Sequence, residues 1–166
     1  MTFTVDIIGP QRLRTLDAEQ WDALSHNALD PSPCYARHVV LAGLDTIDRA
    51  AQLRGVVIYR NGVLVGLFPA ARKLLSLTGV KAAQNKYQFG SQPLIHREHA
   101  GGVVDAWLQA IESGKIPRRW AFVNLDLSSR FLDLYRIHSA NRSMIAIPSR
   151  TYRRMRLKRT VNSFTE

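Results

Sequence analysis

Cysteine is almost absent from this sequence of 166 residues, because Cys34 is the only one. One cysteine excludes an intramolecular disulfide and a cysteine-based metal cluster, and it suits a reducing compartment. No apolar run approaches the ~18 residues that a membrane span needs. The N-terminus has no basic region followed by an apolar core, so no signal peptide is expected. We therefore expect a cytoplasmic protein without a membrane span.

Glycine-rich phosphate-binding patterns are also absent. Neither Gly-x-x-x-x-Gly-Lys nor Gly-x-Gly-x-x-Gly occurs in the chain, which leaves no P-loop and no dinucleotide fingerprint. Gly101 and Gly102 precede a predicted helix, whose N-terminus could bind an anion. An ordinary turn-to-helix junction is the simpler interpretation of this pair.

Acidic residues are missing from residues 134–165, which hold eight of the lysines and arginines. This segment supplies most of the formal net charge of +10. Positive charge on a segment attracts phosphates, acidic surfaces or anionic lipid. We define residues 142–166 as the basic C-terminal segment. Its candidate anion- or phosphate-binding residues are Arg150, Arg153, Arg154 and Arg156, and a solvated edge strand or tail is the alternative.

The remaining composition is that of a globular protein, with 46% hydrophobic residues. A chain of this length can bury roughly 70% of its unfolded surface, so one domain over residues 1–166 is the simplest organisation. Periodicity and turn residues predict the elements. Strands are expected over 3–8, 87–90, 120–127, 144–147 and 151–157, a hairpin over 53–75, and helices over 17–28, 34–44, 101–113 and 128–140.

Two local signals are specific. Asn61-Gly62 lies between apolar runs rich in β-branched residues, which predicts a hairpin with a type I′ turn. Asp17, with Gln20 three residues on, predicts a capping box at a helix start. Helices that alternate with strands, including a hairpin, predict a mixed α/β (α+β) fold in which helices flank the sheet.

Candidate site residues are few. His96 and His99 could bring two imidazoles near a metal, but the pair has no Glu-x-x-His partner and no cysteine nearby and follows a proline-containing loop, so no metal site is expected. Cys34 at a predicted helix start could be a nucleophile, although a small buried side chain is the simpler interpretation. Asn85, Tyr87 and Gln92 belong to a polar cluster around a predicted strand and loop, where a pocket could form.

Several short motifs occur in an order that resembles a known family. They are Trp21-Asp22-Ala23-Leu24, Pro31-Ser32-Pro33-Cys34-Tyr35, residues 61–69, Gly90-Ser91-Gln92-Pro93-Leu94-Ile95, residues 120–125, and Pro148-Ser149-Arg150. This order resembles the first half of GNAT-type acyltransferases of the CelD-like or BioF2-like group, which are related to FemAB peptidyltransferases. The resemblance implies a GNAT-like mixed, largely antiparallel sheet flanked by helices, and N-acyltransfer from acetyl-CoA or another acyl-CoA to an amine.

Members of that group are about twice this length and have two GNAT-like halves. The resemblance places the acyl-CoA pyrophosphate loop, a Gln/Arg-x-x-Gly-x-Gly/Ala turn, in the second half. Residues 1–166 contain no such turn, so no cofactor-binding or catalytic residue is transferred to this chain. We expect a domain that is weakly active or inactive alone and that pairs with a second half or a second copy.

A different class of function is also compatible with the sequence. The chain could be a small basic binding module that uses residues 142–166 to hold nucleic acid or an acidic partner. Such binding would weaken steeply with salt, because cation–phosphate contacts release counterions.

Overall fold

The computed structural model of the chain describes residues 2–45, 53–72, 79–82, 92–122, 124–144 and 146. These residues form a mixed α/β fold with a largely antiparallel sheet flanked by helices, as the sequence predicts. The strands are β1 (Phe3–Ile8), β2 (Leu53–Arg60), β3 (Val63–Arg72), β4 (Gly79–Ala82), β5 (Leu94–Ile95) and β6 (Arg119–Ala121). The helices are α1 (Pro10–Arg14), α2 (Ala18–His26), α3 (Arg37–Asp45), α4 (Ala100–Glu112) and α5 (Arg130–Ser139), with short 3₁₀ helices η1 (Pro33–Tyr35) and η2 (Arg97–His99).

The strand order is β1-β2-β3-β4-β6, and β5 also pairs with β3. Strand β4 pairs antiparallel with residues 70–72 of β3, whereas β5 pairs antiparallel with residues 66–67. The two strands therefore follow one another along the same edge of β3. Strand β6 pairs in parallel with β4, and α4 lies in the crossover between these two strands, as parallel pairing requires.

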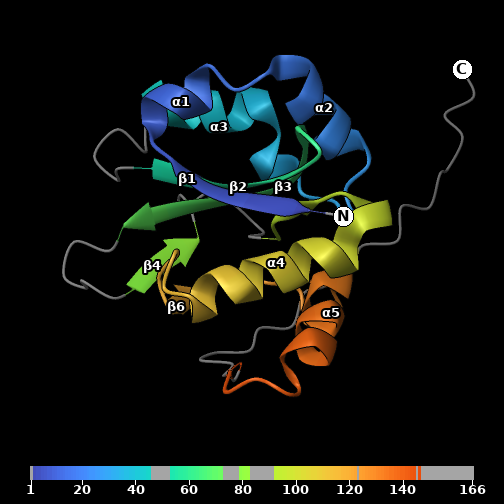
Figure 1. Cartoon of the computed structure of the whole chain (residues 1–166). Helices are drawn as coiled ribbons and strands as arrows, with labels where there is room; N and C mark the ends of the chain where they lie inside the picture. The colour runs from blue at the N-terminus through green and yellow to red at the C-terminus, as the bar shows by residue number, and fades with distance from the viewer. Residues whose placement is uncertain are drawn as a thin grey trace, which may run out of the picture.

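The sheet separates two layers of helices. Figure 1 shows α1, α2 and α3 on one face and α4 and α5 on the other. Each face has its own apolar cluster. Trp21 and Tyr35 are fully buried under the first layer, and Phe68 and Trp107 anchor the second. No helix in the described ranges combines the length and apolarity that a membrane crossing requires.

The predicted hairpin is confirmed. Asn61 and Gly62 both have positive φ, at 51° and 81°, as a type I′ turn demands. The ladder between β2 and β3 has a register shift between Ile58 and Tyr59. Gly114, just after α4, has a φ of 74° and ends that helix in the left-handed region.

The capping box forms only in part. The Asp17 carboxylate accepts a hydrogen bond from the Gln20 backbone N–H at 2.9 Å, which caps α2 as predicted. The side chain of Gln20 does not complete the box, because its Oε1 accepts from the Leu64 N–H at 2.8 Å. Gln20 thus fastens α2 to the first residues of β3. Helix α1 was not expected; Pro10 starts it as the first helical residue.

One predicted strand is wrong in extent, and a second is not formed at its first residue. The strand expected over 120–127 ends at Ala121, since Asn124 has a φ of 57° and Leu127 is 51% exposed. The strand expected over 144–147 is not formed at Met144, whose N–H donates to the Arg142 carbonyl at 2.7 Å in a tight turn. The strands predicted over 87–90 and 151–157 lie outside the described residues.

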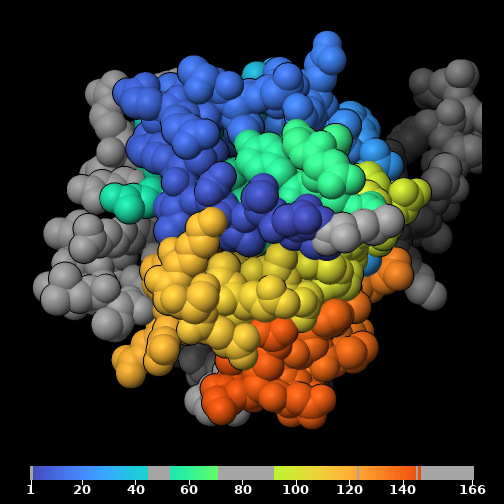
Figure 2. Space-filling model, in the orientation of Figure 1, coloured from blue at the N-terminus to red at the C-terminus, as the bar shows by residue number. Residues whose placement is uncertain are grey.

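Arg142 joins α4 to the residues that follow α5. Its guanidinium donates to Asp105 at 2.6 Å and to Glu112, both on α4, and its Nε donates to the His138 carbonyl at 3.1 Å. Its side chain is only 17% exposed. In Figure 2 the surfaces of α4 (yellow) and α5 (orange) adjoin.

We expect Arg142→Met to lower the free energy of unfolding by about 1–2 kcal/mol, because it leaves two carboxylates without their partly buried cation. The matched control is Arg136→Met. Arg136 pairs with Asp133 at 3.2 Å, but both side chains are about 60% exposed; the control should change stability by less than about 0.5 kcal/mol. Urea unfolding followed by circular dichroism measures both, and equal losses would contradict the prediction.

Candidate functional site

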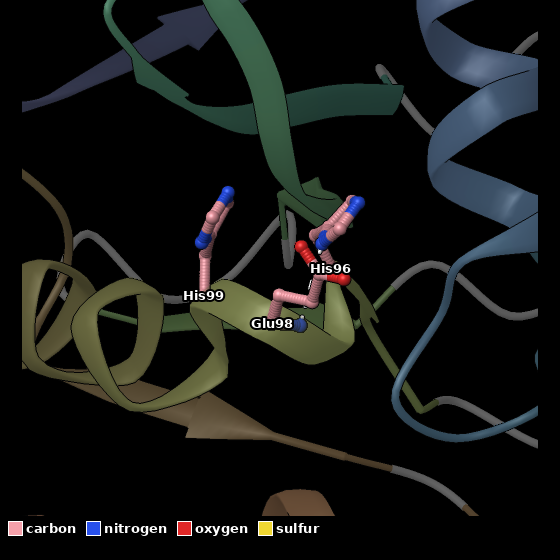
Figure 3. A group of neighbouring side chains, drawn as sticks. All are labelled: His96, Glu98 and His99. Atoms are coloured by element: carbon pink, nitrogen blue, oxygen red, sulfur yellow. Dashed lines mark hydrogen bonds between the residues drawn. The ribbon is translucent and has the colours of Figure 1, made fainter.

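The candidate site is the turn in which β5 leads into α4. The His96 N–H donates to the Val65 carbonyl at 2.9 Å, which ties the turn to β3. The Nδ1 of His96 accepts from the Glu98 N–H at 3.3 Å and so caps η2. The His96 and His99 rings stack with centroids 4.9 Å apart. Figure 3 shows both rings on the same side of the turn, with the Glu98 carboxylate beside His96.

His96, Glu98 and His99 place three metal-ligating atoms within 4.8 Å of one another. A cation already lies against this group, because Nη1 of Arg60 at the end of β2 is 2.8 Å from Nδ1 and 3.0 Å from Nε2 of His99. A second cation at this distance would be repelled. The geometry therefore favours an arginine–imidazole contact that fastens the turn to β2 over a metal coordination sphere.

The imidazole of His96 is held in its neutral form. Its partial burial lowers its pKa below the ordinary value, the neighbouring His99 adds to this effect, and the Glu98 carboxylate opposes it. A neutral His96 keeps Nδ1 available as an acceptor for the Glu98 N–H. At neutral pH the turn thus keeps its cap.

The sequence of this turn is close to the pyrophosphate loop of the resembled family. Arg97-Glu98-His99-Ala100-Gly101-Gly102 matches Gln/Arg-x-x-Gly-x-Gly/Ala except that Ala100 takes the place of the first glycine. The structure places these residues between a strand and a helix, which is the context such a loop needs. A search that allowed alanine at that position would have found the segment from sequence.

The first three backbone donors of this segment are occupied by the chain itself. The Arg97 N–H donates to the Asn27 carbonyl at 2.9 Å, the Glu98 N–H donates to His96, and the His99 N–H donates to the His96 carbonyl at 3.0 Å. The Arg97 guanidinium donates to the carbonyls of His26 and Asn27, at 3.0 and 3.3 Å. These contacts satisfy the last carbonyls of α2. The Arg97 guanidinium therefore caps the end of α2 and is not free to bind an anion.

The two glycines have packing reasons of their own. A Cβ on Gly102 would lie 2.4 Å from the ring of Phe3, and a Cβ on Gly101 would lie 3.3 Å from Nε2 of His138. Both positions let neighbouring elements approach the first turn of α4. With the N–H groups of Arg97, Glu98 and His99 bonded and both glycines in contact with neighbouring side chains, the turn as folded does not fit the pyrophosphate of an acyl-CoA.

The other predicted site residues are not brought together. Asn85, Tyr87 and the four arginines Arg150, Arg153, Arg154 and Arg156 lie outside the described residues. Gln92 is described and is 7% exposed, with its carbonyl accepting from the Ser32 hydroxyl at 2.6 Å. Cys34 is half-buried in η1 and packs against the apolar cluster under the first helical layer.

A groove of about 220 Å³ lies elsewhere, over α1 and the start of α2. Its polar lining includes Arg12, Asp17, Gln20 and Tyr59. Asp17 and Gln20 are engaged in the helix cap and the bond to β3 described above. Burial raises the pKa of Tyr59 despite the nearby Arg12, so its phenol stays protonated at neutral pH. Gln92 does not line this groove.

Comparison with known proteins gives similarity at the level of structure alone. No family model matches the chain, and no curated protein matches it. The similar solved structures are N-acetyltransferases. One is a ribosomal-protein-alanine N-acetyltransferase from Brucella melitensis biovar Abortus 2308, with 15% identity, a TM-score of 0.48, and coverage of 95% of this chain and 100% of that one.

Two others are structures of the aminoglycoside N-acetyltransferase AAC(6')-Iy, one with a bisubstrate analogue and one with CoA. Each is 17% identical to this chain and covers 93% of it. The match covers 99% of the chain with the bisubstrate analogue, with a TM-score of 0.46, and 97% of the chain with CoA, with a TM-score of 0.45. At this identity the similarities establish neither an activity nor a substrate for this chain.

Proposed function

We propose that this chain is an N-acyltransferase-family domain of GNAT type, in the CelD-like or BioF2-like group, with little or no activity alone. Its acyl donor would be an acyl-CoA and its acceptor an amine. The binding sites for both would be completed by a second acyltransferase half. The observation that carries the proposal is the turn into α4. It has the position and nearly the sequence of a pyrophosphate loop, yet its first donors are bonded within the chain.

The order of the elements supports this proposal. One strand and a layer of helices precede an antiparallel hairpin, and a crossover helix then joins two parallel strands. Of the motifs quoted from the sequence, Trp21 lies in α2, Asn61-Gly62 at the hairpin turn, and Leu94-Ile95 in β5. Fold-level likeness alone would not carry a function, so the proposal depends on this combination.

Acyl transfer to an amine requires two catalytic contributions from a protein. A general base removes a proton from the attacking nitrogen, and backbone N–H groups stabilise the oxyanion that forms from the thioester. Before either step, the acyl-CoA must be held by its pyrophosphate, and in the described turn the N–H groups of Arg97, Glu98 and His99 already have acceptors. This chain alone is therefore expected to be a poor catalyst.

The test is release of free CoA from acetyl-CoA in the presence of a panel of primary amines. We expect the isolated chain to turn over at less than about 0.1 s⁻¹, against about 10 s⁻¹ for a typical enzyme. Adding a separate polypeptide that contains a second α/β half with the glycine-rich turn should raise the rate. Turnover near the typical value by the chain alone would contradict the proposal.

A further inference from the structure

The groove over α1 opens between the first layer of helices and the sheet. Helix α1 packs on β1 and β2 (Figure 1), and the groove of about 220 Å³ lies where α1 leads into α2. Its floor is apolar, because Ile8 and Leu64 are each 2% exposed and Leu16 packs half-buried against the same cluster. Pockets for drug-sized ligands begin at about 300 Å³, so this groove suits a ligand with few non-hydrogen atoms.

A β-bulge shapes the floor of the groove. The ladder between β2 and β3 is shifted at Tyr59, which pairs with Leu64 instead of Val65. In a regular ladder Leu64 would point to the other face of the sheet, because a slip of one residue reverses the direction of a side chain. The bulge therefore places Leu64 on the groove side, opposite Tyr59, and Gln20 Oε1 accepts from the Leu64 N–H at 2.8 Å. Bulges commonly re-aim side chains beside functional sites.

Three side chains in the lining offer hydrogen-bond donors, namely Arg12, Tyr59 and Gln20. Among the residues that the structure describes, none accepts a hydrogen bond from the Arg12 guanidinium or from the Tyr59 hydroxyl. Because Gln20 uses its Oε1 for the bond to β3, the polar group left to it is the donor Nε2. Burial raises the pKa of the Tyr59 phenol, although the nearby Arg12 lowers it, so this group also remains a donor at neutral pH.

The lining also contains a carboxylate, that of Asp17, which caps α2. The chain uses a second carboxylate in the same way at α5, where Asp30 accepts from the Arg130 N–H at 3.0 Å and from the Phe131 N–H at 2.9 Å. Partial positive charge at a helix N-terminus stabilises such a carboxylate. Asp17 therefore opposes the attraction of Arg12 for an anion less than a free carboxylate would. A single negative charge suits this balance better than two.

Donors above an apolar floor match a ligand with a charged acceptor at one end and a short apolar chain at the other. We propose that the groove is a binding site for a small alkyl monocarboxylate, whose carboxylate contacts Arg12 and Tyr59 and whose alkyl group lies on the apolar floor. A guanidinium matches a carboxylate with two parallel hydrogen bonds. The proposal goes beyond the acyltransferase function and does not depend on it, because binding in the groove requires no acyl-CoA.

The probe is isovalerate, which has one carboxylate and a branched alkyl group. Its binding to the full chain is followed by NMR titration, with the Tyr59 ring signals as the local readout. Each comparison ligand lacks one feature of the probe: isovaleramide lacks the charge, acetate lacks the branched chain, and inorganic phosphate lacks any alkyl group. The variants are Arg12→Gln and Tyr59→Phe. The matched control is Arg54→Gln, because Arg54 is exposed and does not line the groove.

We expect isovalerate to saturate the wild type and Arg54→Gln with a Kd of about 1 mM or below. Arg12→Gln and Tyr59→Phe should each bind it at least about tenfold more weakly, because each loses a hydrogen bond to a charged group. The three comparison ligands should bind the wild type at least about tenfold more weakly than isovalerate, since each lacks either the charge or the apolar contact.

Absence of saturable binding by the wild type would overturn the proposal. Equal affinity for any of the three comparison ligands would also overturn it, because the site would then recognise neither the charge nor the alkyl group together with it. Unchanged affinity in Arg12→Gln or Tyr59→Phe would place the ligand elsewhere, and an equal loss in Arg54→Gln would assign the effect to net charge. The comparison ligands are tested on the unaltered chain, so the proposal stays testable if a variant fails to fold.

Discussion

Replacing Trp107 with alanine is expected to lower the free energy of unfolding by about 3–5 kcal/mol, the range for large aromatic residues in a core. Trp107 is 2% exposed and stacks on Phe68, with centroids 5.2 Å apart and planes within 4°. Its ring also meets Trp120 and Phe131 edge-on, at 5.5 and 6.1 Å. Denaturant unfolding followed by far-ultraviolet circular dichroism measures the loss without relying on tryptophan fluorescence.

Two phenylalanine variants separate packing from hydrogen bonding. The Nε1 of Trp107 is buried and has no hydrogen-bond partner among the residues that the structure describes, so Trp107→Phe removes no bond seen there and relieves an unsatisfied donor. The Nε1 of Trp21 donates to the Tyr35 carbonyl at 3.1 Å in a buried setting. We expect Trp21→Phe to cost about 1 kcal/mol more of the free energy of unfolding than Trp107→Phe.

For the alanine variant, a Trp107→Ala loss below about 1 kcal/mol would mean that the aromatic cluster does not form the core of this layer.

Gly66→Ala is expected to destabilise the protein by about 2–3 kcal/mol through overpacking. Gly66 lies in β3 beneath α4, and a Cβ there would lie 2.8 Å from Cγ1 of Val103 and 3.1 Å from Cβ of Ile58. Neither contact is with the end of a long flexible side chain. The strand and the helix must separate to admit one methyl group. Equilibrium unfolding in urea measures the effect.

A double-mutant cycle identifies the clash. Val103→Ala alone should cost about 2 kcal/mol by leaving a cavity, but in the Gly66→Ala background it should cost at least about 1 kcal/mol less, since the new methyl group fills that space. The control is Gly9→Ala, because no heavy atom of the described part of the chain lies within 4 Å of a Cβ built there. Strict additivity of the two core variants would contradict the proposed contact between β3 and α4.

Signals that depend on neighbours in sequence predicted the structure well. The Asn61-Gly62 turn follows from the φ values that the two residues tolerate. The cap of α2 at Asp17 follows from a carboxylate three residues from an unpaired N–H. The apolar face of α4 follows from helical periodicity, and its residues Val103, Val104 and Leu108 are fully buried.

Features that depend on residues far apart could not be predicted. Gln20 has the right spacing for a capping box, yet it bonds Leu64, 44 residues away, because the folded sheet brings a strand N–H within reach. The strand at Trp120 was predicted too long, since alternating apolar residues continue beyond Asn124 although the backbone there is left-handed. Local pattern carries no information about which residues the sheet finally accepts.

The candidate site shows the same contrast between features that neighbours in sequence predict and features that depend on distant residues. His96 and His99 could be selected by spacing, and the structure does place their rings together. The arginine that decides their environment, Arg60, lies 39 residues earlier in the chain. The similarity of residues 97–102 to a phosphate loop is visible in the sequence. The hydrogen bond from the Arg97 N–H to the Asn27 carbonyl follows only from the fold.

The contact between Asp30 and the start of α5 also sets an order of events during synthesis. It joins residues 100 positions apart, so most of the chain must leave the ribosome before this contact can form. Contacts of such long separation are the slow ones, because closing the intervening loop costs entropy before any bond is gained. The helices α1 to α3 and the hairpin emerge first and can pack against one another. The contact of Asp30 with the start of α5 can therefore form only late in synthesis, after α5 has emerged.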